Sequence, residues 1–159
     1  RRRISDTVNQ QFTKPAAVVT EKPIEQNLPT EVNQEKQPDL TPEKQKQIEK
    51  INQYMAEQKP FLNPELTLMD LSQNLNIPKH QITLLLNNHL GKNFFEYVNE
   101  FRIEETKKRM IDPQYEHLTL VAIAYECGFN SKSTFNTFFK NATGLTPTEW
   151  RKENKTKED

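Results

Sequence analysis

The chain has 159 residues, only 33% of them hydrophobic, and its 22 basic and 22 acidic side chains give a formal net charge of zero. This length allows one domain of about 100 to 150 residues or a smaller domain with tails, and the low apolar share suggests that part of the chain does not fold. One cysteine excludes a disulfide framework and fits a reducing cytoplasm, and no apolar run approaches the ~18 residues of a membrane-spanning helix.

Residues 1–40 are rich in Pro, Gln, Glu and Thr, with isolated apolar residues. Such a segment cannot bury enough apolar surface to offset its ordering entropy, so we expect a disordered linker. The chain opens with Arg1, Arg2 and Arg3 rather than with Met. We therefore expect a piece of a longer protein, in which this basic cluster is either a solvated terminus or a segment next to a missing membrane helix.

An amphipathic helix is predicted for residues 41–59. Thr41, Pro42 and Glu43 form a strong helix start, because Thr caps the first turn and Pro fits its first position. Apolar residues then recur at intervals of three and four, at Ile48, Ile51, Tyr54 and Met55.

Residues 60–92 predict a first helix-turn-helix unit. Thr67 caps a short helix, Asn76 and Ile77 form the turn, Pro78 opens the second helix and Gly91 ends it. The inward positions of the two helices are Leu68, Leu71, Leu75, Ile82, Leu85, Leu86 and Leu90.

A long helix is predicted for residues 93–111, between Asn93 as its cap and the Asp112–Pro113 stop. About 18 residues span roughly 27 Å, which suits a rigid spacer. Its glutamates and basic residues alternate, and we expect mainly a solvated, salt-bridged face from Glu100, Glu104, Glu105, Lys107, Lys108 and Arg109.

Residues 112–153 predict a second helix-turn-helix unit, in which Thr119 and Ser131 cap the two helices and Gly128 forms the turn. The two units form an internal repeat. The inward Leu71, Leu75 and Ile77 match Ile123, Cys127 and Phe129, and after a one-residue shift Ile82, Leu85, Leu86 and Gly91 match Phe135, Phe138, Phe139 and Gly144. The sequence therefore predicts an all-α fold, with two helix-turn-helix subdomains joined by a long central helix and a disordered N-terminal tail.

The second unit also resembles the AraC/XylS family of bacterial transcription regulators. The resemblance lies in the run GFNSKSTF at residues 128–135, then Phe139–Lys140, the GLTP run at 144–147, and Trp150–Arg151. It extends over about residues 60–152 and looks like the form common in Bacteroidetes regulators. It implies two reading helices in successive major grooves. By the same resemblance we expect dimerisation or a sensor region outside this fragment, and membrane attachment of the full-length protein through a missing N-terminal region.

The candidate DNA contacts are the polar residues expected on the outer faces of the two reading helices, where amides and hydroxyls can bond base edges and lysines can reach phosphates. They are Lys79, His80, Gln81, Thr83 and Asn87 in the first unit, and Ser131, Lys132, Ser133, Asn136, Thr137, Lys140 and Arg151 in the second. No acid occurs between Glu126 and Glu149, which favours an approach to phosphates. Many relatives carry Arg or Gln where this chain has Leu84, which cannot hydrogen-bond a base.

We expect sequence-specific binding of double-stranded DNA in transcription regulation, with RNA polymerase as a second partner and a cytoplasmic location. No Gly-rich phosphate loop, nucleophile–base pair or metal-ligand spacing appears, so we expect no enzyme, cofactor, metal or small-molecule site in this fragment. The alternative is a helical protein-interaction module that kept the fold without DNA reading, which zero net charge and Leu84 favour slightly.

Overall fold

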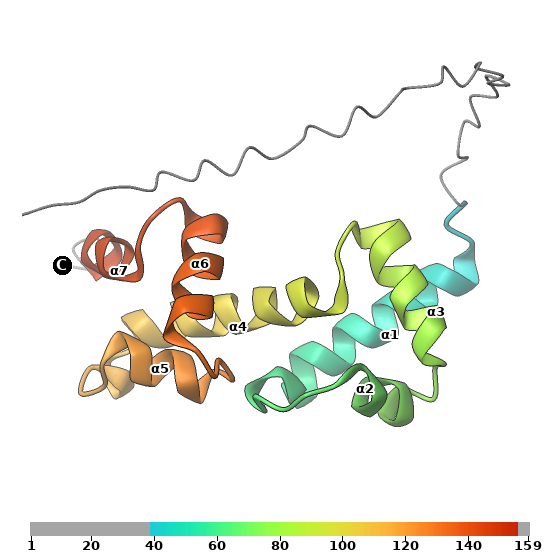
Figure 1. The fold of residues 1–159 in the computed structure, drawn as a ribbon, viewed down its shortest axis with the longest axis horizontal. Coiled ribbons are helices and arrows are strands. Elements are labelled where there is room, and N and C mark those ends of the chain that lie inside the picture. The colour runs from blue at the N-terminus through green and yellow to red at the C-terminus, as the bar shows by residue number, and fades with distance from the viewer. Residues whose placement is uncertain (1–38, 156–159) are drawn as a thin grey trace, which may run out of the picture. The chain divides into compact units, whose positions relative to one another are not determined.

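A computed structural model describes residues 39–155, and over this range the chain is helical without any strand (Figure 1). Seven α-helices follow one another, with two short 3-10 helices and one π-helical segment between them. The α-helices are α1 (Pro42–Gln58), α2 (Leu68–Leu75), α3 (Lys79–Leu85), α4 (Phe94–Ile111), α5 (Leu120–Glu126), α6 (Lys132–Thr143) and α7 (Pro147–Lys155). The shorter segments are η1 (Pro60–Leu62), the π-helical η2 (Leu86–Leu90) and η3 (Pro113–Tyr115).

The predicted capping residues all hold helix N-termini. Side-chain oxygens accept hydrogen bonds from backbone amides three residues on, at Thr41, Thr67, Asn93, Thr119 and Ser131. At α2 and α4 the bond is reciprocal, since Asp70 and Glu96 accept from the backbone amides of Thr67 and Asn93. These caps satisfy amides that have no partner inside the helix, which is why the helix starts could be predicted so closely.

The first core lies between α1, α2, α3 and the first half of α4. Its buried side chains include Ile51 and Met55 from α1, Leu71 from α2 and Ile82 from α3. On α4, Tyr97 and Val98 join this core, and the Tyr97 hydroxyl donates to Asn52 Oδ1 on α1 at 2.7 Å. The predicted helix of residues 41–59 is thus the element that covers the first helix-turn-helix unit.

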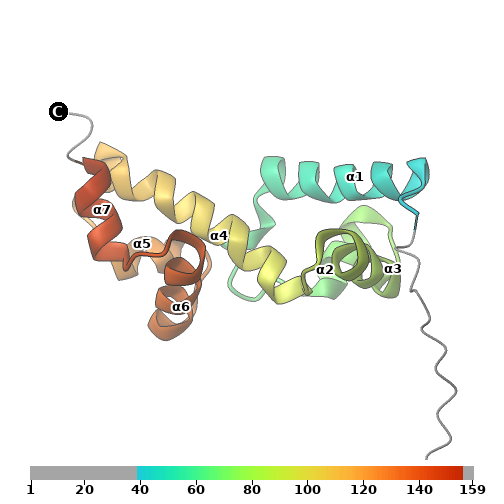
Figure 2. The same cartoon turned by 90° about the horizontal axis from the view of Figure 1, so that it is seen from above.

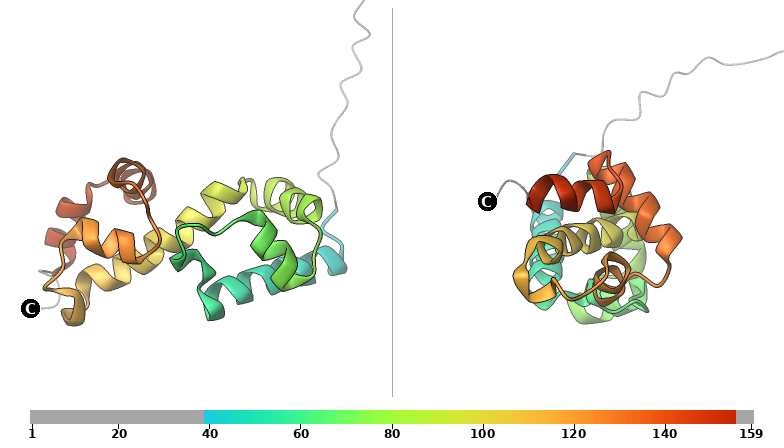
Figure 3. Two further views of the ribbon diagram at one scale, coloured as in Figure 1. Left: turned by 60° about the horizontal axis from the view of Figure 1, so that its bottom comes forward. Right: turned by 90° about the vertical axis from the view of Figure 1, so that its left-hand side faces the viewer.

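The second core lies between the other half of α4 and α5, α6 and α7. Buried residues are Ile103 and Met110 on α4, with Ala124, Phe135 and Phe139 from the second unit. Trp150 packs edge-on against Phe139 at a centroid distance of 5.8 Å, as expected for a residue that anchors the last helix. Figure 2 shows the two units at opposite ends of α4, and Figure 3 shows them from two further directions.

Two expectations need correction. The helix predicted to open at Pro78 begins at Lys79, and its last turn, η2, is π-helical rather than α-helical. The face expected to be solvated along α4 is partly buried, because Glu105 is only 8% exposed. The linker predicted for residues 1–40 lies outside the described residues, apart from Asp39 and Leu40.

Candidate nucleic-acid interface

The outer face of α6 carries the polar residues that the sequence predicts there. Phe135 and Phe139 turn into the second core, and the half-buried Phe138 packs edge-on against Phe95 at 5.4 Å. With the aromatic residues facing inward, the exposed side chains are Lys132, Ser133, Asn136, Thr137 and Lys140. Ser131, at the cap, is half-buried and lies 2.9 Å from the Ser133 hydroxyl.

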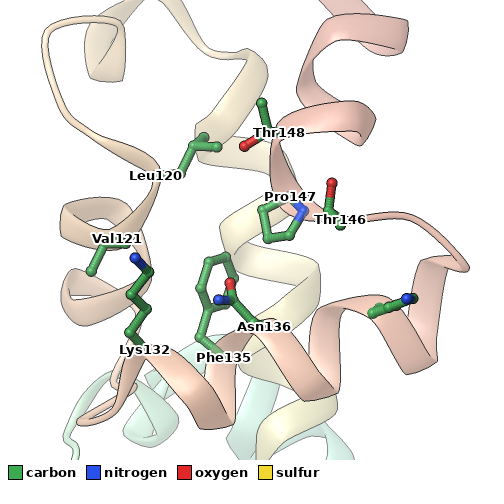
Figure 4. Close-up of a pocket in the computed structure, with 9 residues that line it drawn as sticks. Leu120, Val121, Lys132, Phe135, Asn136, Thr146, Pro147 and Thr148 are labelled. Carbon is green, nitrogen blue, oxygen red and sulfur yellow. The ribbon is translucent and has the colours of Figure 1, made fainter.

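A hollow of about 450 Å³ lies beside this face (Figure 4). Lys132, Asn136 and Lys140 line it at intervals of four residues, so they form one stripe along α6. Opposite them are Leu120 and Val121 at the start of α5, and Thr146, Pro147 and Thr148 at the start of α7. The lining contains two amines and an amide but no carboxylate, which makes the hollow suitable for an anionic or base-edge ligand.

The acid Glu149, which follows the lining residue Thr148, is engaged at the start of α7. Glu149 accepts hydrogen bonds from the Thr146 hydroxyl at 2.7 Å and from the Thr146 amide at 2.9 Å. These two bonds, followed by the charge of Lys140, lower the pKa of Glu149 below its ordinary value. The carboxylate is therefore ionised but engaged with the helix start.

The face of α3 is less polar than that of α6. Lys79, His80 and Asn87 are exposed, and Thr83 is half-buried, with its hydroxyl donating to the Lys79 carbonyl at 3.0 Å. Leu84 is 54% exposed in the middle of this face. An isolated apolar side chain here can touch a thymine methyl but cannot accept or donate a hydrogen bond.

Gln81 is turned towards α1. Its Nε2 donates to Gln47 Oε1 at 2.9 Å, and the side chain is half-buried. A second hollow, of about 380 Å³, lies alongside and is lined by Lys44, His80, Gln81, Leu84, Leu85, Asn88 and His89. The first reading helix is thus partly engaged with α1, whereas α6 is free along its outer stripe.

Arg151 is not brought to the α6 stripe. It is half-buried on α7, and its charge contributes to the lowered pKa of Glu116, after the hydrogen bond and charge of Lys155. Cys127 is buried, and burial is the main reason that its pKa is raised, so it is a core residue and not a reactive thiol. Within residues 39–155 no group of His, Cys, Asp and Glu could hold a metal ion, and no helix is long and apolar enough to cross a membrane.

Sequence reasoning missed Arg102, which lies inside the molecule. It is 6% exposed on α4, although a charged side chain in a helix with many other charged residues is expected at the surface. Burial lowers the pKa of its guanidinium below the ordinary value of arginine. The only signal in the sequence was its position between the apolar Phe101 and Ile103.

Comparison with known proteins supports the architecture. A family profile described as a helix-turn-helix domain matches residues 71–153, more than half of the chain. An uncharacterised HTH-type transcriptional regulator of Staphylococcus aureus (strain COL) is 29% identical over 103 residues, which cover 65% of this chain and 13% of that protein. The uncharacterised HTH-type transcriptional regulator YpdC of Escherichia coli (strain K12) is 35% identical over 85 residues, which cover 54% of this chain and 29% of that protein.

Among solved structures, an AraC-type transcriptional regulator from Chromobacterium violaceum has the same fold. The similarity covers 71% of this chain and 96% of that chain, with a TM-score of 0.58 and 21% sequence identity. The matched part of this chain spans only 13% of the length of the Staphylococcus aureus relative.

Proposed function

Because this chain belongs to the AraC-type helix-turn-helix family of transcription regulators, we propose that it binds double-stranded DNA sequence-specifically through α3 and α6. The observation that carries this proposal is the stripe of Lys132, Asn136 and Lys140, exposed beside a hollow without a carboxylate. A helix that faces phosphates and base edges needs this combination of amines and amides.

In this proposal α6 supplies most of the hydrogen bonds to bases. Asn136 pairs with an adenine edge and Lys132 with a guanine edge, while Ser133 and Thr137 extend the contact along the same helix. Lys140 contacts phosphate, and Ser131 presents the amide end of α6 to the backbone of the DNA. Arg151 remains a phosphate contact only if DNA extends past α7, since its charge faces Glu116.

The first reading helix contributes fewer base contacts. Lys79 and Asn87 contact phosphate, and His80 and Thr83 reach base edges, with Leu84 against a thymine methyl. Gln81 does not contact a base in this proposal but holds the first reading helix against α1, since its side-chain amide donates a hydrogen bond to Gln47. RNA polymerase as a partner, action in the cytoplasm of a bacterial cell, and dimerisation or sensing by a region outside this fragment belong to the same proposal.

The test is a binding selection with the 159-residue chain and a pool of random duplexes, at 50 and 200 mM salt. We expect binding that weakens steeply with salt, because lysine–phosphate contacts release counterions, and an enriched motif with two halves about one helical turn (~34 Å) apart. Equal affinity for unrelated duplexes would contradict specific reading. Absence of binding at both salt concentrations would favour a protein-interaction module.

A further inference from the structure

Near the middle of α4 the two cores meet, and Arg102 lies at the boundary between them. Val98, one turn before it, is in the first core, and Ile103, directly after it, is in the second. Leu62 of η1 packs against both cores. The contacts between η1, α4 and the second unit at this boundary therefore determine the spacing of the two reading helices.

The guanidinium of Arg102 donates three hydrogen bonds there. Nε donates to the Phe61 carbonyl at 2.8 Å, in the middle of η1, and Nη2 donates to the carbonyl of its C-cap, Asn63, at 3.0 Å, so one planar group holds the C-terminal part of the η1 turn. Nη1 donates to Asn99 Oδ1 at 3.2 Å on α4 itself. A rigid fork loses little side-chain entropy on forming several bonds at once, and a lysine in its place cannot reproduce their geometry.

The turn of the second unit closes on the same point. Gly128 has φ of 96°, and a Cβ placed on it would stand 2.1 Å from the Phe61 carbonyl oxygen and 2.8 Å from Arg102 Nε. The guanidinium also lies over the Phe129 ring at 5.9 Å. We call this set of residues, Phe61, Asn63, Asn99, Arg102, Gly128 and Phe129, the η1 clasp. It brings η1, which precedes α2 in the first unit, against the turn between α5 and α6 in the second unit.

A chain of ion pairs crosses the same boundary. Lys59 lies 3.0 Å from Glu105 on α4, Glu105 lies 3.0 Å from Arg109, and Arg109 reaches Glu126 on α5 at 3.4 Å. Because Glu105 and Arg109 are largely buried, water screens this part of the chain of ion pairs less than a surface pair. The clasp is thus supported by a second link between α1, α4 and α5.

We infer that Arg102 is a positioning residue that fixes the second unit against η1, sets the distance between α3 and α6, and so selects DNA by the spacing of its half-sites. The selection of DNA rests on the proposed function, whereas the role of Arg102 in holding the second unit against η1 does not. Each added base pair turns one half-site by about 34° relative to the other, so a rigid pair of helices tolerates few spacings. Binding through two linked contacts gains affinity only where both can be made together.

The geometry is tested without DNA by the distance between two spin labels. Met69 on α2 and Tyr125 on α5 are exposed, at 45% and 48%, outside the clasp and the proposed DNA contacts, and the native Cys127 is buried. Nitroxides on Met69→Cys and Tyr125→Cys should give one narrow distance distribution by electron–electron double resonance. We expect a broad distribution when Arg102→Lys or Arg102→Gln is added.

The consequence for DNA is tested with the two half-sites from the selection, moved apart or together by one and two base pairs, and with a duplex that carries the second half-site alone. The unmodified chain should prefer one spacing. Both Arg102 variants should lose that preference and bind the best spacing roughly tenfold to a hundredfold less tightly, while binding to the single half-site stays within about twofold. Unchanged single-site binding excludes a general loss of folding.

Several results would overturn the inference. The first is a distance distribution that stays narrow and unmoved in both Arg102 variants. The second is an unchanged spacing preference in variants whose distance distribution is broad. The third is loss of helical circular dichroism in both variants, since Arg102 would then hold the fold and not the spacing. If the Arg102 variants broaden the distance distribution but the unmodified chain binds no duplex, the result would support the clasp and overturn the proposed function instead.

Discussion

The turn of the first helix-turn-helix unit contains Asn76 at φ 54°, whereas the turn of the second contains Gly128 at φ 96°. Both residues precede a buried side chain, Ile77 or Phe129, and the reading helix of each unit is followed by a glycine of positive φ, Gly91 or Gly144. The local plan is therefore the same. The difference is that the clasp presses on Gly128, leaving no room for a side chain.

The two reading helices also share a pattern but differ in detail. Phe138 and Leu85 match in the repeat, yet α6 continues as twelve residues of α-helix, while α3 passes after seven into the π-helical η2. The position of Thr137 in α6 is taken by the exposed Leu84 in α3. The repeated sequence pattern thus produces the same local fold in both units, but the two reading helices differ in length and in the polarity of their outer faces.

The largest expected effect separates the two glycine turns. Gly128→Ala should destabilise the protein by about 3 kcal/mol or more, since backbone strain at positive φ adds to a clash with the Phe61 carbonyl. Gly144→Ala is the matched control, because φ is 76° but nothing lies within 4 Å, and it should cost about 1 kcal/mol. Urea unfolding measures both, and equal losses would contradict the close approach at Gly128.

A second effect would sharpen the assignment of base reading to α6. Asn136→Ala or Lys132→Ala should weaken binding to the selected duplex by about 1–3 kcal/mol and relax specificity at one base pair. Asn141→Ala is the control, because Asn141 is exposed on the same helix but lies beside a different groove, with Glu96 and Glu100. Fluorescence anisotropy against single-base variants of the motif measures the loss. An equal effect of Asn141→Ala would show that the stripe has no special role.

The ion pairs of the boundary predict a dependence on pH. Burial alone would raise the pKa of Glu105, but hydrogen bonds and charges from Lys59 and Arg109 outweigh it, so the pKa is lowered from 4.5. In acid the unfolded chain therefore binds more protons than the folded chain. The stabilisation of the fold by ionised Glu105 is complete above the ordinary pKa of glutamate and is lost as the pH falls through the lowered pKa.

Glu105→Gln should therefore lower the free energy of unfolding at pH 7 by about 1–2 kcal/mol and flatten its decline in acid. Glu104→Gln is the control, because Glu104 pairs with Lys107 while 61% exposed, and it should change stability by less than about 0.5 kcal/mol. Unfolding curves from pH 3 to pH 7 distinguish them. A decline in acid that Glu105→Gln leaves unaltered would contradict this assignment.

The smallest effect concerns Leu84. If it touches a thymine methyl, replacing that thymine by deoxyuridine in the first half-site should weaken binding by about 0.8 kcal/mol, the value of one buried methyl group. Leu84→Ala should weaken binding similarly and remove the sensitivity to deoxyuridine. A scan of deoxyuridine positions measures this, and sensitivity retained in Leu84→Ala would place another side chain at the methyl.

The sequence by itself determined the helix starts, the two apolar stripes, the repeat and the outer stripe of α6. The helix starts and the stripes depend on residues three or four positions apart, so a cap such as Ser131 or a buried pair such as Phe135 and Phe139 can be recognised locally. The repeat follows from the comparison of two such local patterns. The family resemblance rests on the same short-range pattern.

Tertiary structure alone decided the burial of Arg102 and Glu105 and the engagement of Gln81. Their partners Phe61, Lys59 and Gln47 lie 41, 46 and 34 residues away in the chain. A charged residue in a charge-rich helix is expected at the surface, unless carbonyls or charged groups from distant parts of the chain are folded against it. The spacing of the two reading helices is set by such contacts, and for that physical reason no local pattern predicts it.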